Sequence, residues 1–348
     1  MTRDLRKEEA FDPMRRSIVP ATLLAVVTLV GACSSAATQA PTQAPASAAP
    51  ASVAPASVAP ASAVASMAAS AAPASAVASS APIAAVPSGQ LIFPGKLVIC
   101  SDIPYPPQEF FDANGNATGS DIDLGAEIAK RLGLTMEVQN SVFDTIIAAL
   151  TGGKCDIIIS AQNITTSRVK QVDMIPYFQA GQSFVVAKGN PKNITTQNDL
   201  CGKTIAAESG TTEIDYLNGS GDYKGQGLSA ACVTAGKTKI NVKEYQKDSD
   251  ALLALQAGQV DAYFADSPVA GYYTVQHPDQ FQLSGLTLGV ADEGISVAKG
   301  NTGLRDAVQQ ALISMINDGT YLTILKKYGD DSGAITAAMA AKLNYIGQ

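Results

Sequence analysis

Apolar residues follow two alternating patterns along the last three quarters of the chain. Short continuous apolar runs, such as residues 97–99 and 157–159, have the length of strands that are buried on both faces, as in a parallel sheet. Between such runs, other segments place apolar residues three and four positions apart, which is typical of amphipathic helices. Strands that alternate with helices predict an α/β fold. The predicted helices cover residues 122–132, 144–151, 249–258 and 304–317.

Four of the predicted strands end in polar residues. Ligands of open α/β sheets bind beyond the carboxyl ends of the strands, so we expect these residues to surround one site. The first strand leads to Asp102 and Tyr105, the second to Ser160, Asn163 and Arg168, the third to Glu208, Gly210, Thr211 and Thr212, and the fourth to Asp266.

The chemistry of these residues suits a zwitterion. Arg168 can hold a carboxylate through two parallel hydrogen bonds. The turn at residues 209–212 leads into a predicted helix, whose first N–H groups also favour an anion. Asp266 can accept hydrogen bonds from an ammonium group. Each residue also has a plainer interpretation, as a surface arginine, a helix N-cap or a cap before Pro268. Together they favour an α-amino acid as the ligand.

Residues 34–91 separate the N-terminus from this α/β region. Up to Gln90 the tract contains no charged or aromatic residue, and variants of A-P-A-S-V recur in it. Its prolines interrupt helices and it has little to bury, so we expect a disordered tether. In an extended polyproline conformation it could reach about 180 Å.

Residues 1–33 predict a signal peptide of a lipoprotein. Arg15 and Arg16 precede an apolar segment at residues 18–30, which is too short to span a bilayer. The L-V-G-A-C sequence that ends at Cys33 resembles a bacterial lipoprotein box, which implies that Cys33 carries a lipid such as palmitate. An ordinary secretory signal peptide is the alternative. Either way, the folded part is expected outside the cytoplasmic membrane.

The other four cysteines are expected to form disulfides in this oxidising compartment. Three pairings are possible, and the positions beside strands favour Cys100 with Cys155 and Cys201 with Cys232, each within one lobe. A metal site is not expected, because the chain has no C-x-x-C and its only histidine is His277. The sequence indicates no cofactor, and the net charge of −7 argues against nucleic acid as a partner.

Motifs from about residue 97 to residue 328 resemble the extracellular solute-binding proteins of polar amino-acid ABC transporters. They are Y-P-P-Q-E-F-F, G-S-D-I-D-L-G-A-E-I-A-K-R-L-G, F-D-T-I-I-A-A-L, D-I-I-I-S-A-Q-N-I-T-T-S-R, E-S-G-T-T, A-D-S-P and N-D-G-T-Y-L-T-I-L-K-K-Y-G. The resemblance implies the type II periplasmic-binding-protein fold, with two lobes, mainly parallel sheets flanked by helices, and two crossover strands as a hinge. Residues 92–182 and 291–348 would form lobe 1, and residues 183–290 would form lobe 2.

The resemblance also implies roles for individual residues. Arg168 and Thr212 would bind the ligand's α-carboxylate, and Asp266 its α-ammonium. The remaining expected ligand contacts are Ala161 and Asn163 near the ammonium, Tyr105 and Phe143 on either side of the ligand's side chain, Asp102 and Glu208 at its far end, and Ser160 at the end of its strand. The expected partners are the amino acid, an ABC permease and its ATPase, and the protein is expected to be a monomer.

A basic amino acid, arginine first, is the predicted ligand. Glu208 in A-E-S-G-T-T resembles arginine-binding members, and Asp102, Glu109 and Asp144 are further acids expected near the side-chain pocket. A guanidinium suits such a set of carboxylates and aromatic rings. If Glu208 is instead exposed or caps the following helix, glutamine or another polar amino acid is the alternative. A prephenate- or arogenate-type dehydratase on the same fold is a further alternative, with Glu208 or Glu213 as its acid.

Overall fold

The computed structural model describes residues 83 and 85–346. The predicted signal peptide, the lipidation at Cys33 and most of the predicted tether lie outside these residues. Immediately before the expected boundary at residue 91, Ile83 and Val86 pack against the hydrophobic core. The side-chain oxygen of Gln90 also accepts a hydrogen bond of 2.7 Å from the backbone N–H of Leu304. The segment that leads into the first strand is thus packed on the folded part.

Eight strands form one mixed sheet in the order β4-β1-β5-β10-β6-β9-β7-β8. Parallel pairing joins β1 to β4 and β5, and β7 to β8 and β9, whereas β10 and β6 pair antiparallel with their neighbours. The strands of this sheet are β1 (Lys96–Ser101), β4 (Thr135–Asn140), β5 (Ile157–Ile158), β6 (Val172–Ala187), β7 (Thr204–Glu208), β8 (Asn241–Tyr245), β9 (Ala262–Asp266) and β10 (Phe281–Ala298), and a separate hairpin pairs β2 (Phe110–Phe111) with β3 (Ala117–Thr118).

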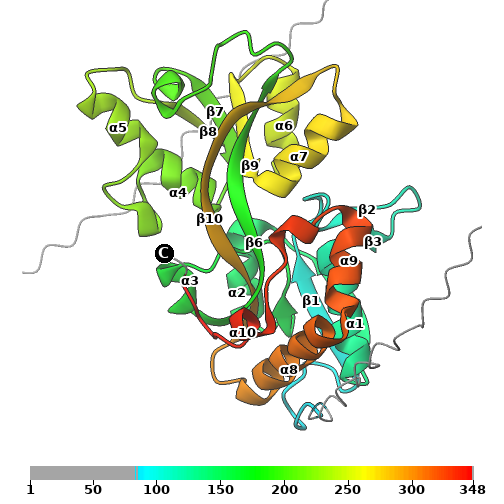
Figure 1. Ribbon diagram of the computed structural model, residues 1–348. Helices are drawn as coiled ribbons and strands as arrows, with labels where there is room; N and C mark the ends of the chain where they lie inside the picture. The colour runs from blue at the N-terminus through cyan, green and yellow to red at the C-terminus, as the bar shows by residue number, and fades with distance from the viewer. Residues whose placement is uncertain (1–82, 84, 347–348) are drawn as a thin grey trace, which may run out of the picture. The chain divides into compact units, whose positions relative to one another are not determined.

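Helices pack around two parts of this sheet (Figure 1). We call the part around β1, β4 and β5 lobe 1, and the part around β7, β8 and β9 lobe 2. Lobe 1 carries α1 (Ser120–Arg131), α2 (Ile146–Thr151), α3 (Thr166–Val169), α8 (Thr302–Asp318), α9 (Thr320–Tyr328) and α10 (Ala337–Ala340), and lobe 2 carries α4 (Thr212–Asn218), α5 (Leu228–Thr234), α6 (Asp248–Gln256) and α7 (Ser267–Gln276).

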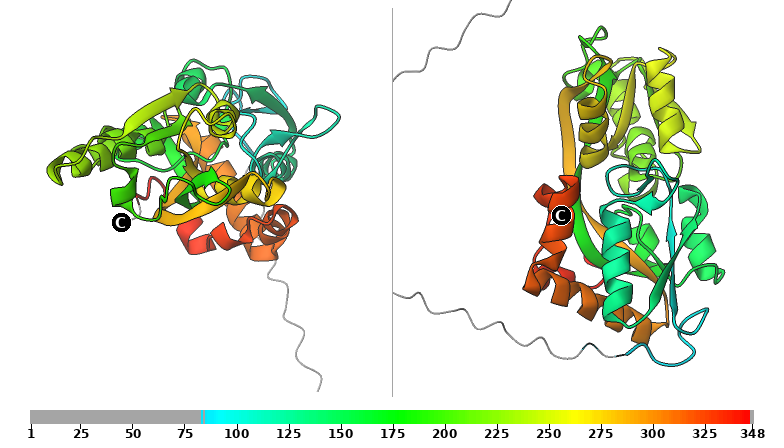
Figure 2. Two further views of the ribbon diagram at one scale, coloured as in Figure 1. Left: turned by 90° about the horizontal axis from the view of Figure 1, so that it is seen from above. Right: turned by 90° about the vertical axis from the view of Figure 1, so that its right-hand side faces the viewer.

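The strands β6 and β10 run through both lobes, as two views show (Figures 1 and 2). They pair antiparallel from Phe281 opposite Ala187 to Ala298 opposite Val172, with three register shifts along the way. The expected lobe boundaries, at residues 182/183 and 290/291, fall within these two strands. Sequence patterning did not predict strands of 16 and 18 residues, because polar residues and glycines within them, such as Gln179, Gly181 and Gln182 in β6, break the run of apolar positions.

The four helices predicted from apolar spacing are confirmed, with small shifts at their ends. The segment 144–151 begins with a 3₁₀ turn over Phe143–Thr145 before α2. The other three correspond to α1, α6 and α8, and α8 extends the prediction by two residues at its start and one at its end. These helices were predictable because each buries one apolar face against the sheet.

Each lobe has its own buried apolar cluster on each face of the sheet. In lobe 1, Leu124 and Ile128 of α1 pack with Ile99 and Ile157 of the strands, and all four side chains are at most 1% exposed. In lobe 2, one cluster gathers apolar residues of α6, α7 and β9, and it also includes Tyr105 from lobe 1. The lobes therefore touch across the space between them, as in a closed clamshell.

Both disulfides connect the predicted cysteines. Cys100 at the end of β1 is bonded to Cys155 just before β5, and Cys201 before β7 is bonded to Cys232 in α5. Each bond lies within one lobe, so neither restrains the movement of one lobe against the other. The pairing favoured among the three possibilities is confirmed.

We expect the Cys100→Ala/Cys155→Ala variant to lose about 2–5 kcal/mol of unfolding free energy, because the bond closes a loop of 55 residues in the unfolded chain. Denaturant titration of the purified protein measures this loss. The exposed Lys154→Ala is a suitable control and should unfold like the wild type. An unfolding free energy within about 0.5 kcal/mol of wild type in the double variant would contradict the expectation.

Candidate functional site

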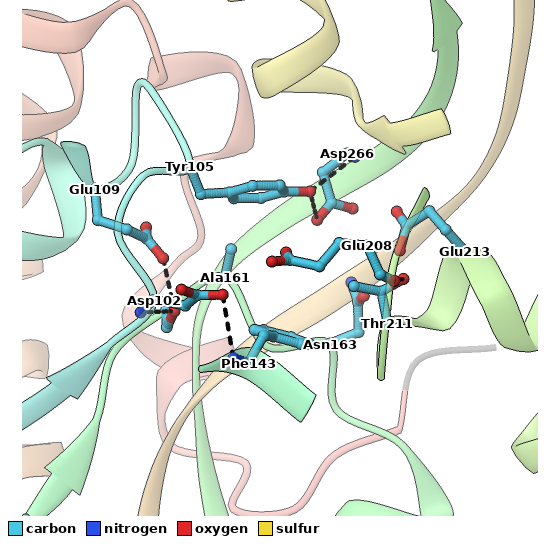
Figure 3. Close-up of a pocket in the computed structure, with 11 residues that line it drawn as sticks. Asp102, Tyr105, Glu109, Phe143, Ala161, Asn163, Glu208, Thr211, Glu213 and Asp266 are labelled. Atoms are coloured by element: carbon cyan, nitrogen blue, oxygen red, sulfur yellow. Dashed lines mark hydrogen bonds between the residues drawn. The ribbon is translucent and has the colours of Figure 1, made fainter. Parts of the chain in front are cut away.

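A small cavity lies between the two lobes (Figure 3). Its walls come from the ends of β1, β5, β7 and β9 and from the loops that follow them, which is where the sequence placed the site. The lining residues are Asp102, Tyr105, Glu109, Phe143, Ser160, Ala161 and Asn163 from lobe 1, and Glu208, Thr211, Glu213 and Asp266 from lobe 2. Eight of the ten residues predicted as ligand contacts are among them.

Arg168 and Thr212 are the two predicted residues that do not line this cavity. They lie next to it, in a neighbouring hollow that shares Phe143. The Arg168 guanidinium donates to the carbonyl of Asn163 at 2.9 Å and to that of Gly210 on lobe 2 at 3.0 Å, and it lies 5.3 Å from the centre of the Phe143 ring. In this arrangement the guanidinium satisfies backbone carbonyls from both lobes.

Thr212 links the same region across the cleft. Its hydroxyl is 2.6 Å from the side-chain oxygen of Asn163 on lobe 1 and accepts a hydrogen bond of 2.9 Å from Gln182 of β6. The side-chain nitrogen of Asn163 has no hydrogen-bond partner among the described residues. At this end the cavity therefore offers the amide of Asn163, while the Thr212 hydroxyl and the buried Arg168 guanidinium lie next to its lining.

Asp266 ends β9 and faces Tyr105 across the cleft (Figure 3). The Tyr105 hydroxyl donates to one oxygen of the Asp266 carboxylate at 3.0 Å and accepts from the Asp266 backbone N–H at 3.1 Å. The other carboxylate oxygen has no partner in the part of the chain that the structure describes. Burial, together with the negative charge of Glu213, raises the pKa of Asp266 well above its usual range.

Asp102 and Glu208 meet at another wall of the cavity, one from each lobe. Asp102 accepts a hydrogen bond of 3.1 Å from the backbone N–H of Phe143, and Glu208 accepts one of 3.1 Å from that of Asp248. Glu208 is 5% exposed and its carboxylate contacts the start of α6, so the interpretation of Glu208 as an exposed residue or a cap of the following helix is wrong. Burial and the nearby Asp102 raise the pKa of Glu208 to about 11.

Three lining residues were not among the predicted ligand contacts. Glu109 accepts a hydrogen bond of 2.7 Å from Ser160, Thr211 donates to the carbonyl of Glu208 at 2.7 Å, and Glu213 is 2% exposed. Glu109 and Thr211 stand in the motifs Y-P-P-Q-E and S-G-T-T, which was a usable signal. The sequence around Glu213 did not indicate a ligand contact, because acids are common in the first turn of a helix, where they interact favourably with the helix dipole.

The cavity is strongly acidic. Five carboxyl groups line it, and no Lys, Arg or His of the described residues belongs to the lining. Burial is the main cause of the raised pKa of each: Asp102, Glu109, Glu208, Glu213 and Asp266. Uncompensated carboxylates are costly to bury, so this cavity favours either bound protons or a positively charged ligand.

Metal binding and membrane spanning find no support in the described part of the chain. No three Asp, Glu, His or Cys residues within residues 83 and 85–346 are arranged to hold a metal ion. None of the helices described is both long and apolar enough to cross a bilayer.

Comparisons with known proteins identify the same region. The sequence profile of bacterial extracellular solute-binding proteins, family 3, matches residues 97–331. The L-cystine-binding protein TcyJ of Escherichia coli (strain K12) is 27% identical over 235 residues, which cover 67% of this chain and 82% of that protein.

Solved structures with the same fold include an ancestral arginine-binding protein bound to arginine. It is 38% identical, covers 67% of this chain and 98% of its own, and superposes with a TM-score of 0.60. The structure of an ancestral arginine-binding protein bound to glutamine gives the same identity and TM-score, and covers 68% of this chain and 98% of its own. The family match and the structural matches thus cover the same two-lobed part of the chain that contains the cavity.

The buried carboxyl of Glu208 predicts a pH-dependent stability. Its folded pKa of about 11 lies above the ordinary value of 4.5, so the folded state keeps a proton that the unfolded chain releases. The stability from this proton is fully present below about pH 4.5 and is lost as the pH rises towards 11, with a slope of at most about 1.4 kcal/mol per pH unit. We expect Glu208→Gln to flatten the decline between about pH 5 and about pH 9 in denaturant titrations of the ligand-free protein.

Glu244→Gln, on the exposed side of β8, is the control and should decline with pH as the wild type does. Equal slopes for Glu208→Gln and wild type would show that Glu208 does not carry this proton.

Proposed function

The chain belongs to the bacterial extracellular solute-binding proteins, family 3, and from this premise we propose that it captures a basic L-amino acid, arginine first, for an ABC permease. Membership of the family establishes the coarser function: the chain is an extracellular or periplasmic binding protein for a polar amino acid, and not an enzyme. The choice of a basic ligand is the proposal.

The five carboxyl groups of the cavity are the observation that carries this choice. A zwitterion with a neutral side chain brings one positive and one negative group, and therefore compensates none of the excess acid. Arginine or lysine adds a second positive group, which can replace bound protons at a carboxyl pair. The arginine-bound ancestral protein, at 38% identity, supports the same choice.

The α-amino acid group would lie between Arg168 and Asp266. We expect the Arg168 guanidinium and the Thr212 hydroxyl to bind the carboxylate once the guanidinium turns from the carbonyls of Asn163 and Gly210. The ammonium would lie against Asp266, whose free oxygen lacks a partner among the described residues, with Ser160, Ala161 and Asn163 beside it.

The side chain would extend between two aromatic rings towards a pair of acids. Tyr105 and Phe143 both line the cavity and can contact a guanidinium through their ring faces. Beyond them, Asp102 and Glu208 offer carboxylates from opposite lobes, so one cation can bridge the lobes. Closure on the ligand would then be a shift of population towards the closed state.

Glutamine is the second candidate. An ancestral arginine-binding protein that is 38% identical to this chain is also known bound to glutamine. The site of that protein therefore accommodates a neutral amide. If Glu208 stays protonated, a carboxylic acid next to Asp102 can donate to an amide oxygen. The excess of acids favours arginine over this alternative.

We also propose that the protein is anchored by a lipid at Cys33, with the Ala/Pro/Ser-rich tract from residue 34 to about residue 82 as the tether, since Ile83, Val86 and Gln90 contact the folded part. The L-V-G-A-C sequence and the composition of the tether support this proposal. The anchor would keep the folded part on the outer face of the cytoplasmic membrane, within reach of the permease.

Calorimetric titration with arginine, lysine and glutamine tests the ligand. We expect arginine to bind more tightly than glutamine, and Arg168→Ala to lose about 2–5 kcal/mol of binding free energy, roughly thirtyfold or more, because a buried charge pair loses one partner. Lys170→Ala, exposed on the same segment, should bind like the wild type. Tight binding of glutamine with none of arginine would reject the basic ligand, and wild-type affinity in folded Arg168→Ala would reject the role of Arg168.

Membrane fractionation of cells that express the full chain tests the anchor. We expect the wild type to incorporate labelled palmitate and to sediment with the membranes, and Cys33→Ser to do neither. Ser34→Ala is the matched control and should behave like the wild type. Sedimentation of Cys33→Ser with the membranes would contradict a lipid anchor at this residue.

A further inference from the structure

Lys247 lies at the edge of the acidic cavity and crosses from lobe 2 to lobe 1. It precedes α6 as its N-cap residue, and its ammonium donates to the carbonyl of Ile103 at 3.1 Å. The same ammonium lies 3.7 Å from an oxygen of the Asp102 carboxylate. Among the ion pairs of the described residues, this is the one that includes an acid of the cavity lining.

Lys247 lies close to two acids of the cavity wall, Asp102 and Glu208. Asp248, the next residue, holds Glu208 through its backbone N–H. Lys247 itself faces Asp102, which is 5% exposed, whereas the lysine side chain remains 39% exposed. The partly exposed ammonium of Lys247 thus lies on the solvent side of the two buried carboxyls, Asp102 and Glu208.

We propose that Lys247 sets the discrimination between ligands with positive and neutral side chains, by competing with the ligand's side chain for Asp102. This inference rests on the proposed binding of an amino acid with its side chain directed towards Asp102 and Glu208. A positively charged ligand side chain next to Asp102 is repelled by the ammonium of Lys247 and must share the Asp102 carboxylate with it. A neutral amide is not repelled and does not compete for the charge of Asp102.

Lys247 also has a second effect, which is equal for all ligands. Its contacts with Ile103 and Asp102 exist only when the two lobes are close, so they stabilise the closed state. Removal of the lysine weakens closure for every ligand, but relieves repulsion for cationic ligands alone. The ratio of two dissociation constants separates the effects, because the loss of closure cancels in the ratio.

The test is a charge series at one position, read as the ratio of the dissociation constant for glutamine to that for arginine. We expect Lys247→Met to raise this ratio about three- to tenfold, as for one partly screened charge near the ligand cation, and Lys247→Glu to raise it further. Lys247→Arg keeps the charge and should keep the ratio. Lys243→Met, exposed on β8, is the matched control and should leave the ratio unchanged.

Equal weakening of both ligands in Lys247→Met and Lys247→Glu, with a constant ratio, would overturn the inference and leave Lys247 as a contact that only favours closure. A wild-type protein that binds glutamine but not arginine would reject the basic ligand on its own. In that case the inference requires arginine binding to appear in Lys247→Glu, and its absence there would overturn the inference as well.

Discussion

The burial of acids without matching cations is the constraint on which this site depends. Five carboxyl groups face one small cavity, and the guanidinium of Arg168 lies behind its wall, bonded to backbone carbonyls. Burial raises the pKa of each of these carboxyls and so favours the protonated form. A cation in the cavity favours the ionised form instead, so cation binding and the protonation of these groups are coupled.

The fold supplies the two surfaces between which this exchange takes place. The strands β6 and β10 run through both lobes and are the longest elements of the sheet. Cys100–Cys155 and Cys201–Cys232 each stabilise one lobe, and neither connects the two. Rigid lobes with non-covalent contacts between them allow the cavity to open, and they keep each half of the site in order while it does so.

The contacts across the cleft fall into two kinds with different consequences. Tyr105 with Asp266, and Asn163 with Thr212, include the groups proposed to hold the ligand's ammonium and carboxylate. Lys247 with Asp102 lies at the acid pair proposed to meet the ligand's side chain. In the proposed binding mode, general capture and side-chain discrimination are thus separated in space, because they use different walls of the same cavity.

The sequence by itself determined the α/β class, the helices with a clear apolar face, the disulfide pairing and eight of the residues that line the cavity. It could do so because apolar periodicity reports local burial, and polar residues at strand ends gather at one edge of a sheet. Only the tertiary structure decided that Glu213 points inwards, that Glu208 holds the start of α6, and that Lys247 reaches Asp102. These facts depend on the approach of two lobes that are distant in sequence, which no local pattern encodes.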